Sequence, residues 1–446
     1  MLLIPRALHG WLLGSLLLIL SGGLAAAEPL PRATRPEEVG LSSARLERLT
    51  RVTQAHVESG RLPGAVLLLA RYGKIAYLHS FGYRDRSHEA PMMTDAIFRI
   101  YSMTKPITSV ALMMLYEEGK LQLYDPVSRY LPEFAGLRVG VEKTDPTTGQ
   151  TTLETVETPT EMTIQDLLRH TSGLTNPWSG KSPVQTLYRE AGIGSRQDTN
   201  AQLVSKLSKL PLLYPPGTRW EYGISTDVLG RLIEVLSGQS LGSFFEERIL
   251  RPLGMQDTGF AVPAAKLGRL AQPWARPHGP PMTPRFDAGE VPAAQAGGKG
   301  LVSTAGDYYR FAQMLLGGGE CQGVRLLGRK TVEYMTADHL GAIPYEMPRA
   351  VGLSFGLGFE VRRTLGQAVS PGSVGEYGWS GVAGTHFWVD PQEQLVAIYM
   401  VQANEQDRRA LRDQFKVLVL QSLTDEPGRA PGAGRNVVAG SSGAMQ

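Results

Sequence analysis

The chain has 446 residues, 42% hydrophobic and 20% charged, so it is long enough for two or three compact units with a sizeable core. Lysine and arginine number 45 against 42 for aspartate and glutamate, and no basic run is interleaved with aromatic residues. This balance gives no support to a nucleic-acid partner. The single cysteine, Cys321, allows no internal disulfide.

The first 27 residues have the pattern of a secretory signal peptide. Arg6 supplies a positive start, Trp11–Leu20 is an apolar run, and Ala25–Ala27 is a small-residue cleavage site. The run is short of the roughly twenty apolar residues that a membrane-spanning helix needs. An uncleaved anchor stays open as an alternative, but we expect export to the periplasm or beyond, with no stable membrane span after cleavage.

The segment after the signal predicts a helix followed by a β-hairpin. An amphipathic helix begins at Ser42 or Ser43 and ends at Gly60. Two apolar runs follow, Ala65–Ala70 and Ile75–Phe81, separated by turn residues. This order is typical of a sheet with a helix packed on it.

The middle of the chain, from Pro106 to Leu253, has mainly helical spacing of its apolar residues. Within it, Gly140–Thr160 is rich in Thr, Glu, Pro and Gly, and we expect a long surface loop there. Several prolines past Pro263 predict a stretch of coil.

Strand-like alternation returns near the end of the chain. The predicted strands are Leu353–Val361, Thr385–Val389 and Leu395–Gln402, and a last helix runs from about Asp407 to Leu423. We therefore predict an α/β (α+β) fold, in which an antiparallel sheet built from both chain ends and flanked by helices carries an inserted helical domain. The expected units are the sheet domain (28–95 and 298–424), the helical domain (96–297) and a disordered tail (425–446).

The main chemical candidate is Ser102-Met103-Thr104-Lys105, a serine with a lysine three residues on. On a helix, side chains at this spacing lie about 5–6 Å apart, so the lysine ammonium can reach the serine hydroxyl. A serine at a helix start also meets backbone N–H groups that favour developing negative charge. The motif alone arises by chance in many chains. Its setting, between an extended apolar stretch and a buried helix with Pro106 in its first turn, supports a catalytic role for the motif.

Other candidates have weaker settings. Ser240 and Ser354 each stand in a Gly-x-Ser-x-Gly sequence, but neither has the preceding strand and following helix of a nucleophile elbow. We expect Ser240 to cap a helix and Ser354 to lie in a strand. His170 ends a helix, where an imidazole is usually structural. The histidines form no metal-binding pattern and no phosphate-binding glycine motif is present, so we expect neither a metal nor a cofactor.

With Ser102 and Lys105 placed, the chain from about Glu37 to Leu423 resembles the class C β-lactamase-related family. That family includes class C β-lactamases, D-alanyl-D-alanine carboxypeptidases and family VIII carboxylesterases. The resemblance rests on eight segments in order: Ser102–Pro106, Leu121–Pro126, Leu167–Leu174, Pro215–Thr218, Tyr222–Ser225, Pro252–Met255, Gly300–Asp307 and Gly378–Gly381. It implies the fold of serine β-lactamases and penicillin-binding proteins.

The resemblance also implies roles for single residues. Ser102 would be the acylated nucleophile and Lys105 its base or proton-relay partner. Tyr222 would move a proton between nucleophile and leaving group, which requires cationic neighbours that stabilise the phenolate. Whether Lys105 or Tyr222 is the base in acylation stays open. The backbone N–H groups of Ser102 and Val382 would form the oxyanion hole.

Two positions depart from the family's β-lactamases and carboxypeptidases. This chain has Ile224 where those relatives usually have the Asn of Tyr-x-Asn, and Trp379 where they have the cation before x-Gly. Neither side chain can hold a substrate carboxylate or amide, and with Gly381 they would line a pocket for apolar groups. The carboxylesterase branch resembles this chain at both points. We therefore expect a carboxylesterase that acts on short-chain or small esters through Ser102.

Two alternatives stay open. A β-lactamase or D-alanyl-D-alanine carboxypeptidase, acting on a lactam or peptide, is favoured by export and disfavoured by the missing cation. A non-catalytic binding protein of the same fold is disfavoured because it would have no need of Ser102, Lys105 and Tyr222 together. The sequence leaves the natural substrate and the oligomeric state open.

Overall fold

The computed structural model describes residues 29–178, 180–273, 284, 286–347, 350–403 and 408–424. The predicted signal peptide, the predicted tail and part of the proline-rich stretch lie outside these residues. In the described part of the chain, no helix has both the length and the apolar character needed to cross a membrane.

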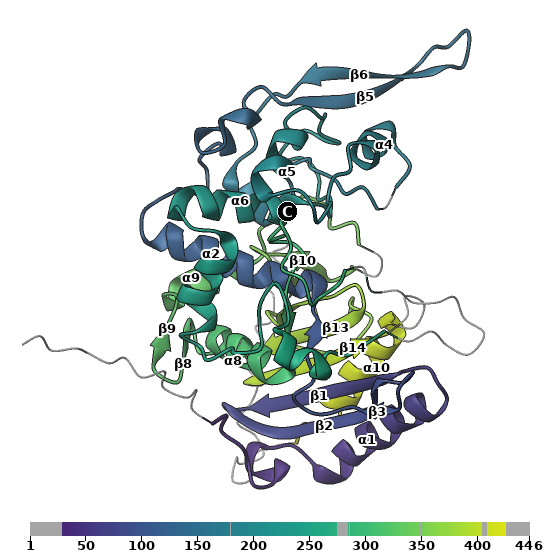
Figure 1. Cartoon of the computed structure of the whole chain (residues 1–446), viewed down its shortest axis with the longest axis vertical. Coiled ribbons are helices and arrows are strands. Elements are labelled where there is room, and N and C mark those ends of the chain that lie inside the picture. The colour runs from purple at the N-terminus through teal and green to yellow at the C-terminus, as the bar shows by residue number, and fades with distance from the viewer. Residues whose placement is uncertain are drawn as a thin grey trace, which may run out of the picture.

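The main sheet is assembled from the two ends of the chain. It has eight antiparallel strands in the order β10-β11-β12-β13-β14-β1-β2-β3 among the described residues. Figure 1 shows the purple N-terminal strands beside the yellow C-terminal strands, and β1 pairs directly with β14. The strands are β1 Gly64–Arg71, β2 Lys74–Asp85, β3 Ala90–Pro91, β10 Leu353–Phe355, β11 Glu360–Arg362, β12 Tyr377–Ser380, β13 Gly384–Asp390 and β14 Leu395–Gln402. The predicted antiparallel sheet is confirmed.

Helices cover both faces of this sheet. Helices α1 (Ser43–Glu58) and α10 (Arg408–Leu420) pack on one face, and α8 (Ala305–Leu316) packs on the other. All eight residues of β1 are therefore buried, with alternate side chains entering the two cores. Burial on both faces explains why this strand is a continuous apolar run in the sequence.

The inserted span is mainly helical and packs above the sheet in Figure 1. Its helices are α2 Thr104–Glu117, α3 Ile164–Leu168, α4 Pro183–Glu190, α5 Asn200–Leu207, α6 Ser225–Ser237 and α7 Leu241–Phe245, which continues as a π-helical turn to Leu250. Helix α9 (Arg329–Met335) follows α8. A short strand pair, β4 (Phe98–Arg99) with β7 (Val302–Ser303), joins the start of the insertion to its end. Two further short strands, β8 (Glu320–Cys321) and β9 (Val324–Arg325), pair with each other after α8.

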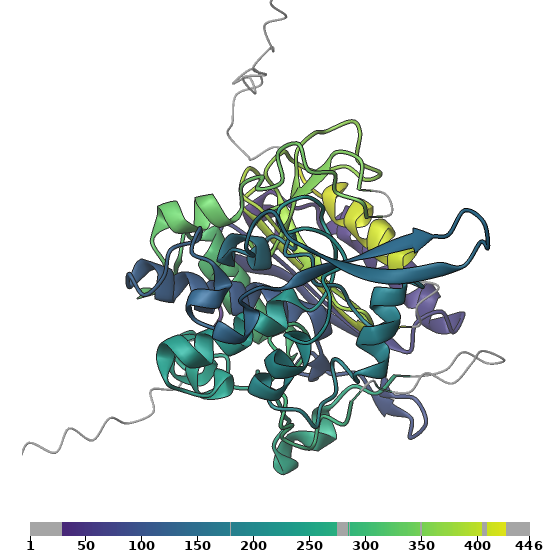
Figure 2. The same ribbon diagram turned by 90° about the horizontal axis from the view of Figure 1, so that it is seen from above.

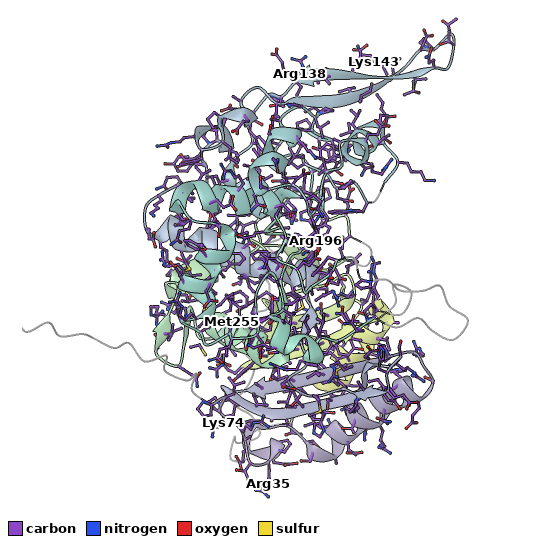
Figure 3. The ribbon with its side chains drawn as sticks, in the orientation of Figure 1. Arg35, Lys74, Arg138, Lys143, Arg196 and Met255 are labelled. Carbon is purple, nitrogen blue, oxygen red and sulfur yellow. The ribbon has the colours of Figure 1, made fainter. Side chains whose placement is uncertain are left out.

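The prediction of a surface loop at Gly140–Thr160 is wrong. The segment forms a hairpin of β5 (Arg138–Thr144) and β6 (Thr151–Glu157) that projects from the helical part, as Figure 2 shows from above. Most of its side chains are exposed, and Figure 3 labels Arg138 and Lys143 on it, but Val139 at its base is buried in the main core. A hairpin that is buried only at its base has little apolar alternation, so its sequence resembles that of a loop.

The single strand predicted at Leu353–Val361 is also wrong, because the segment forms the two strands β10 and β11. The chain turns between them, where Gly356 N–H donates to the Phe359 carbonyl at 2.8 Å. Gly358 has a φ of +96°, a conformation that favours glycine. Ser354 lies in β10, where its hydroxyl donates to Asp338, and no elbow follows it.

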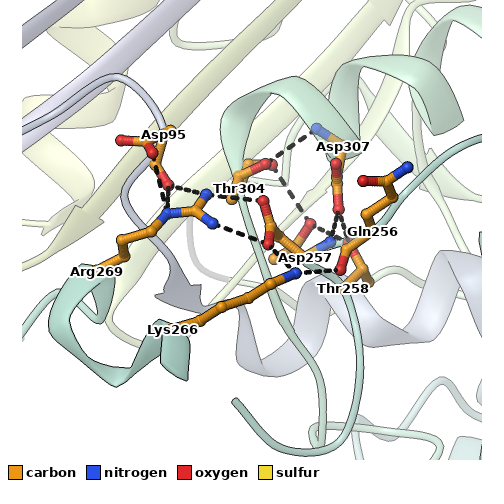
Figure 4. A network of polar contacts seen from close by, with 9 residues as sticks. Asp95, Gln256, Asp257, Thr258, Lys266, Arg269, Thr304 and Asp307 are labelled. Carbon is orange, nitrogen blue, oxygen red and sulfur yellow. Dashed lines mark hydrogen bonds and ion pairs between the residues drawn. The ribbon is translucent and has the colours of Figure 1, made fainter. Parts of the chain in front are cut away.

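A polar network fixes the chain just before β4 (Figure 4). Arg269 binds Asp257 at 2.7 Å and Asp95 at 3.0 Å, which joins the start of β4 to the segment after α7. Asp307, in the first turn of α8, accepts from the Asp257 N–H at 2.7 Å and the Thr258 hydroxyl at 2.9 Å. Burial, together with the negative charge of Asp257, raises the pKa of Asp307 to about 6.

This pKa predicts a distinctive pH dependence of stability. Because the folded-state pKa of Asp307 is raised, its contribution is full below pH 3.8 and is lost as the pH rises through about 6. The stability of the wild type relative to Asp307→Asn should therefore fall by about 2–3 kcal/mol between pH 4 and pH 7. Urea unfolding of both proteins across this range measures the difference, and parallel pH profiles would contradict the assignment.

Candidate active site

Ser102 lies in a tight turn between β4 and α2. Residues 101–103 form one turn of 3₁₀ helix, and α2 begins at the next residue. Tyr101 has a φ of +45°, which costs a non-glycine residue roughly 1–3 kcal/mol and persists only where the surroundings hold it. The Tyr308 hydroxyl helps to hold it, since it donates to the Met103 carbonyl at 2.8 Å.

Lys105 is buried beneath Ser102, with 4% of its surface exposed. Its Nζ donates to the Gly298 carbonyl at 2.7 Å and to Ser102 Oγ at 3.4 Å. The same ammonium lies 4.7 Å from the centroid of the Tyr222 ring. The cation thus faces both the candidate nucleophile and the phenol that would exchange a proton with it.

The segment 297–301 runs along the first turns of α2 and supplies the acceptor for Lys105. Gly297 accepts from the Thr108 hydroxyl at 2.7 Å, and Leu301 N–H donates to Thr104 Oγ1 at 3.1 Å. At Gly298 a Cβ atom would lie 2.5 Å from Asp227 Oδ2 and 3.3 Å from Lys105 Nζ. A methyl group here would therefore displace the Asp227 carboxylate or crowd Lys105.

Tyr222 reaches Ser102 from the loop before α6. Its hydroxyl donates to Ser102 Oγ at 2.7 Å, and its carbonyl accepts from Asn176 Nδ2, also at 2.7 Å. The Tyr222 ring lies among three others, with centroids at 5.1 Å for His170, 5.9 Å for Trp220 and 5.5 Å for Trp379. This packing fixes the direction of the phenol toward Ser102.

His170 packs on the Tyr222 ring without a hydrogen bond of its own. The imidazole is buried, and neither ring nitrogen has a hydrogen-bond partner among the described residues. Burial and the nearby charge of Lys105 hold the pKa of His170 well below its usual value. A neutral ring therefore supports Tyr222 by contact.

The end of β12 closes the other side of the site. Gly381 packs against the chain before Ser102, because a Cβ atom there would lie 2.6 Å from the Ile100 carbonyl oxygen. Thr385 in β13 donates to that same oxygen at 3.4 Å. Val382 follows Gly381, and its N–H has no acceptor among the described residues. This N–H thus belongs to a turn that lines the same cavity as Ser102.

The side chains of Ser102, Lys105 and Tyr222 border a cavity of about 850 Å³. Trp379 and Gly381 line it, and further aromatic walls come from Tyr101, Trp178 and Phe286. Polar and charged residues of the lining that the sequence analysis did not identify include Asn176, Arg196, Glu221, Asp227, Lys299 and Glu346. Asp227 comes from the first turn of α6 and the others come from separate loops, and Arg196 is labelled near the middle of the molecule in Figure 3. No periodic pattern marks such residues in a sequence.

Ile224 does not line the cavity, so its predicted pocket role is wrong. The side chain is 1% exposed and packs in the main core, while its carbonyl accepts from the Asp227 N–H at 2.9 Å. Because α6 begins at the next residue, the side chain turns inward and Asp227 faces the cavity instead. Ser240 caps α7, as predicted, by accepting from the Ser243 N–H.

The arrangement can activate a serine. Two donors, from Lys105 and Tyr222, converge on Ser102 Oγ, so a proton leaving that oxygen has a short path to either group. A base within 2.7 Å of a serine hydroxyl satisfies the distance required for general-base catalysis.

Comparison with known proteins places these residues in a family. The model of the family described as Beta-lactamase matches residues 49–421. Protein Rv1367c of Mycobacterium tuberculosis is 36% identical over 368 residues, which cover 77% of this chain and 87% of that protein. Esterase EstB of Burkholderia gladioli is 30% identical over 380 residues, which cover 80% of this chain and 90% of that protein. The solved structure of EstCE1, a hydrolase with promiscuous acyltransferase activity, superimposes with a TM-score of 0.70 at 26% identity, covering 86% of this chain and 99% of that one.

The close approach at Gly298 predicts the effect of one added methyl group. Gly298→Ala should displace Asp227 or Lys105 and slow the reaction of Ser102 with a fluorophosphonate probe by more than about tenfold, since small misplacements at such sites are costly. Gly268→Ala is the matched control, because its Cβ atom would have no neighbour within 4 Å. Equal labelling rates for the two variants would contradict the proposed place of Lys105.

Proposed function

The chain belongs to the beta-lactamase family and is a serine hydrolase, and on that premise we propose that it is a carboxylesterase for small esters. In this proposal Ser102 is the nucleophile, and Lys105 and Tyr222 carry its proton. We also propose that the chain belongs to the class C branch of the family. The natural acyl and alcohol groups are not specified by it.

The proposed reaction has two steps. In the first, Ser102 Oγ attacks the ester carbonyl carbon while its proton passes to the Tyr222 phenolate or to the neutral Lys105 amine, at 2.7 Å and 3.4 Å. The tetrahedral intermediate then expels the alcohol oxygen, which takes up that proton. In the second step, water attacks the acyl carbonyl carbon and gives a proton to the same group, which passes it to Ser102 Oγ as the bond from Ser102 to the acyl group breaks and the carboxylic acid leaves.

Charge that develops on the carbonyl oxygen would be stabilised by backbone N–H groups of Ser102 and Val382. Each such donor is worth about 3 kcal/mol when it points at the oxyanion rather than at the ground-state carbonyl. The free N–H of Val382, in the turn beside Ser102, supports this assignment.

The observation that carries the ester proposal is the aromatic wall at Trp379. This side chain stands where the family's β-lactamases and carboxypeptidases have a cation, and it packs between Tyr222 and Phe355 at 5.5 Å and 5.1 Å. An aromatic wall beside the nucleophile suits an apolar acyl or alcohol group. The likeness to EstB and to EstCE1, both named for ester or acyl chemistry, gives further support.

We propose export to the periplasm or beyond as the location of this activity. The support is the sequence of residues 1–27, with its positive start, apolar run and Ala25–Ala27 cleavage pattern.

A fluorophosphonate probe tests the nucleophile. The wild type should be labelled at one serine, and Ser102→Ala should lose all labelling because the nucleophilic oxygen is gone. Ser240→Ala, a change at a helix cap, should be labelled as the wild type is. No labelling of the wild type would contradict the enzyme proposal, and labelling that survives Ser102→Ala would contradict this nucleophile.

The substrate class is tested with a panel of three compounds. Hydrolysis of p-nitrophenyl butyrate should have a kcat/KM at least about a hundredfold above that of nitrocefin or a D-Ala-D-Ala peptide, because Trp379 offers no charge to a substrate carboxylate. Comparable turnover of either of the latter two would favour a β-lactamase or carboxypeptidase instead.

A further inference from the structure

Backbone hydrogen bonds hold the turn after β12 both before and after Val382. Gly381 N–H donates to the Thr385 carbonyl at 2.8 Å, and Gly384 N–H returns to the Gly381 carbonyl at 3.0 Å. The Ala383 carbonyl accepts from Ala403 N–H at 2.7 Å. The backbone on either side of Val382 therefore cannot shift without loss of sheet hydrogen bonds.

The carbonyl of Val382 itself accepts from a side chain. Arg408, the first residue of α10, donates to it from Nη1. Arg408 is half-buried and lies against the same turn, since a Cβ atom at Gly384 would be 3.5 Å from Arg408 Cβ. A helix that packs on the far face of the sheet thus contacts Val382, a residue of the turn near Ser102.

The two polar groups of Val382 belong to successive peptide planes joined at one Cα atom. The N–H lies in the plane shared with the Gly381 carbonyl, which is held by the Gly384 N–H at 3.0 Å. The C=O lies in the next plane, and a bond to it restrains the rotation of that plane relative to the first. We propose that Arg408 is a positioning residue, which aims the Val382 N–H at the oxyanion by holding the Val382 carbonyl.

This inference rests on the proposed function, because it assigns Val382 to the oxyanion hole of that reaction. Arg408 lines the cavity, but the proposed role acts through the Val382 carbonyl and requires no contact with the substrate. A guanidinium suits the task, since its planar fork can hold a carbonyl with little loss of rotamer freedom per bond. An oxyanion donor that is slightly misdirected loses affinity for the transition state more than for the ground state. Loss of Arg408 should therefore lower kcat and leave KM nearly unchanged.

The test compares Arg408→Met, Arg408→Lys and the control Arg45→Met on p-nitrophenyl butyrate. Methionine keeps much of the bulk and removes the donor, so kcat should fall about tenfold or more with KM within about twofold. Lysine keeps the charge and can still donate to the carbonyl. The kcat of Arg408→Lys should therefore lie between those of Arg408→Met and the wild type. Arg45 in α1 also donates from Nη1 to a backbone carbonyl, that of Gln421 at 2.6 Å, and is not among the described residues that line the cavity, so its variant should match the wild type.

A kcat for Arg408→Met within twofold of the wild type would overturn the inference, as would an equal loss in Arg45→Met. If Arg408→Met does not fold, as judged by its thermal transition, Arg408→Lys carries the test. A kcat about threefold or more below the wild type, at unchanged KM, then supports the inference, and a kcat equal to the wild type overturns it. Failure of the proposed function is distinguishable, because the wild type would then show neither Ser102 labelling nor ester turnover.

Discussion

A buried ammonium group needs hydrogen-bond acceptors, and Lys105 has them at Gly298 and at Ser102. The need for an acceptor brings the segment 297–301 against α2, where only glycine at 298 leaves room beside Asp227. The same segment continues into β7, which pairs with β4 and so fixes the strand that leads to Ser102. One buried charge therefore connects the position of the serine, the course of the chain after the helical insertion, and the sheet.

The aromatic residues around Tyr222 have a related effect. His170, Trp220 and Trp379 restrict the phenol to one direction, and His170 does so as a neutral ring because burial and Lys105 hold its pKa low. A charged imidazole would compete with Lys105 for the phenolate that the proposed mechanism requires. Trp220 and Trp379 thus direct the Tyr222 ring and also line the cavity.

Local sequence patterns predicted those structural elements that interactions between nearby residues determine. The hairpin of β1 and β2 and the cap at Ser240 follow from apolar runs and from side-chain capping, and both are confirmed. The β5–β6 hairpin is buried only at its base, around Val139, and left no such pattern. Contacts between distant segments, such as the bond from Asn176 to Tyr222 or from Arg408 to Val382, have no signature in one sequence. Ile224 was misplaced for the same reason, since the direction of a side chain at a helix start depends on the packing around it.

The central claim is an acyl-enzyme at Ser102, and it can be observed directly by mass. Wild-type protein mixed with excess p-nitrophenyl butyrate and quenched in acid within milliseconds should gain the mass of one butyryl group. Digestion should place that group on the peptide that contains Ser102, with a burst of one nitrophenolate per protein molecule. A butyryl group on another residue, or ester turnover with no adduct and no burst when deacylation is slowed by low pH, would contradict the account.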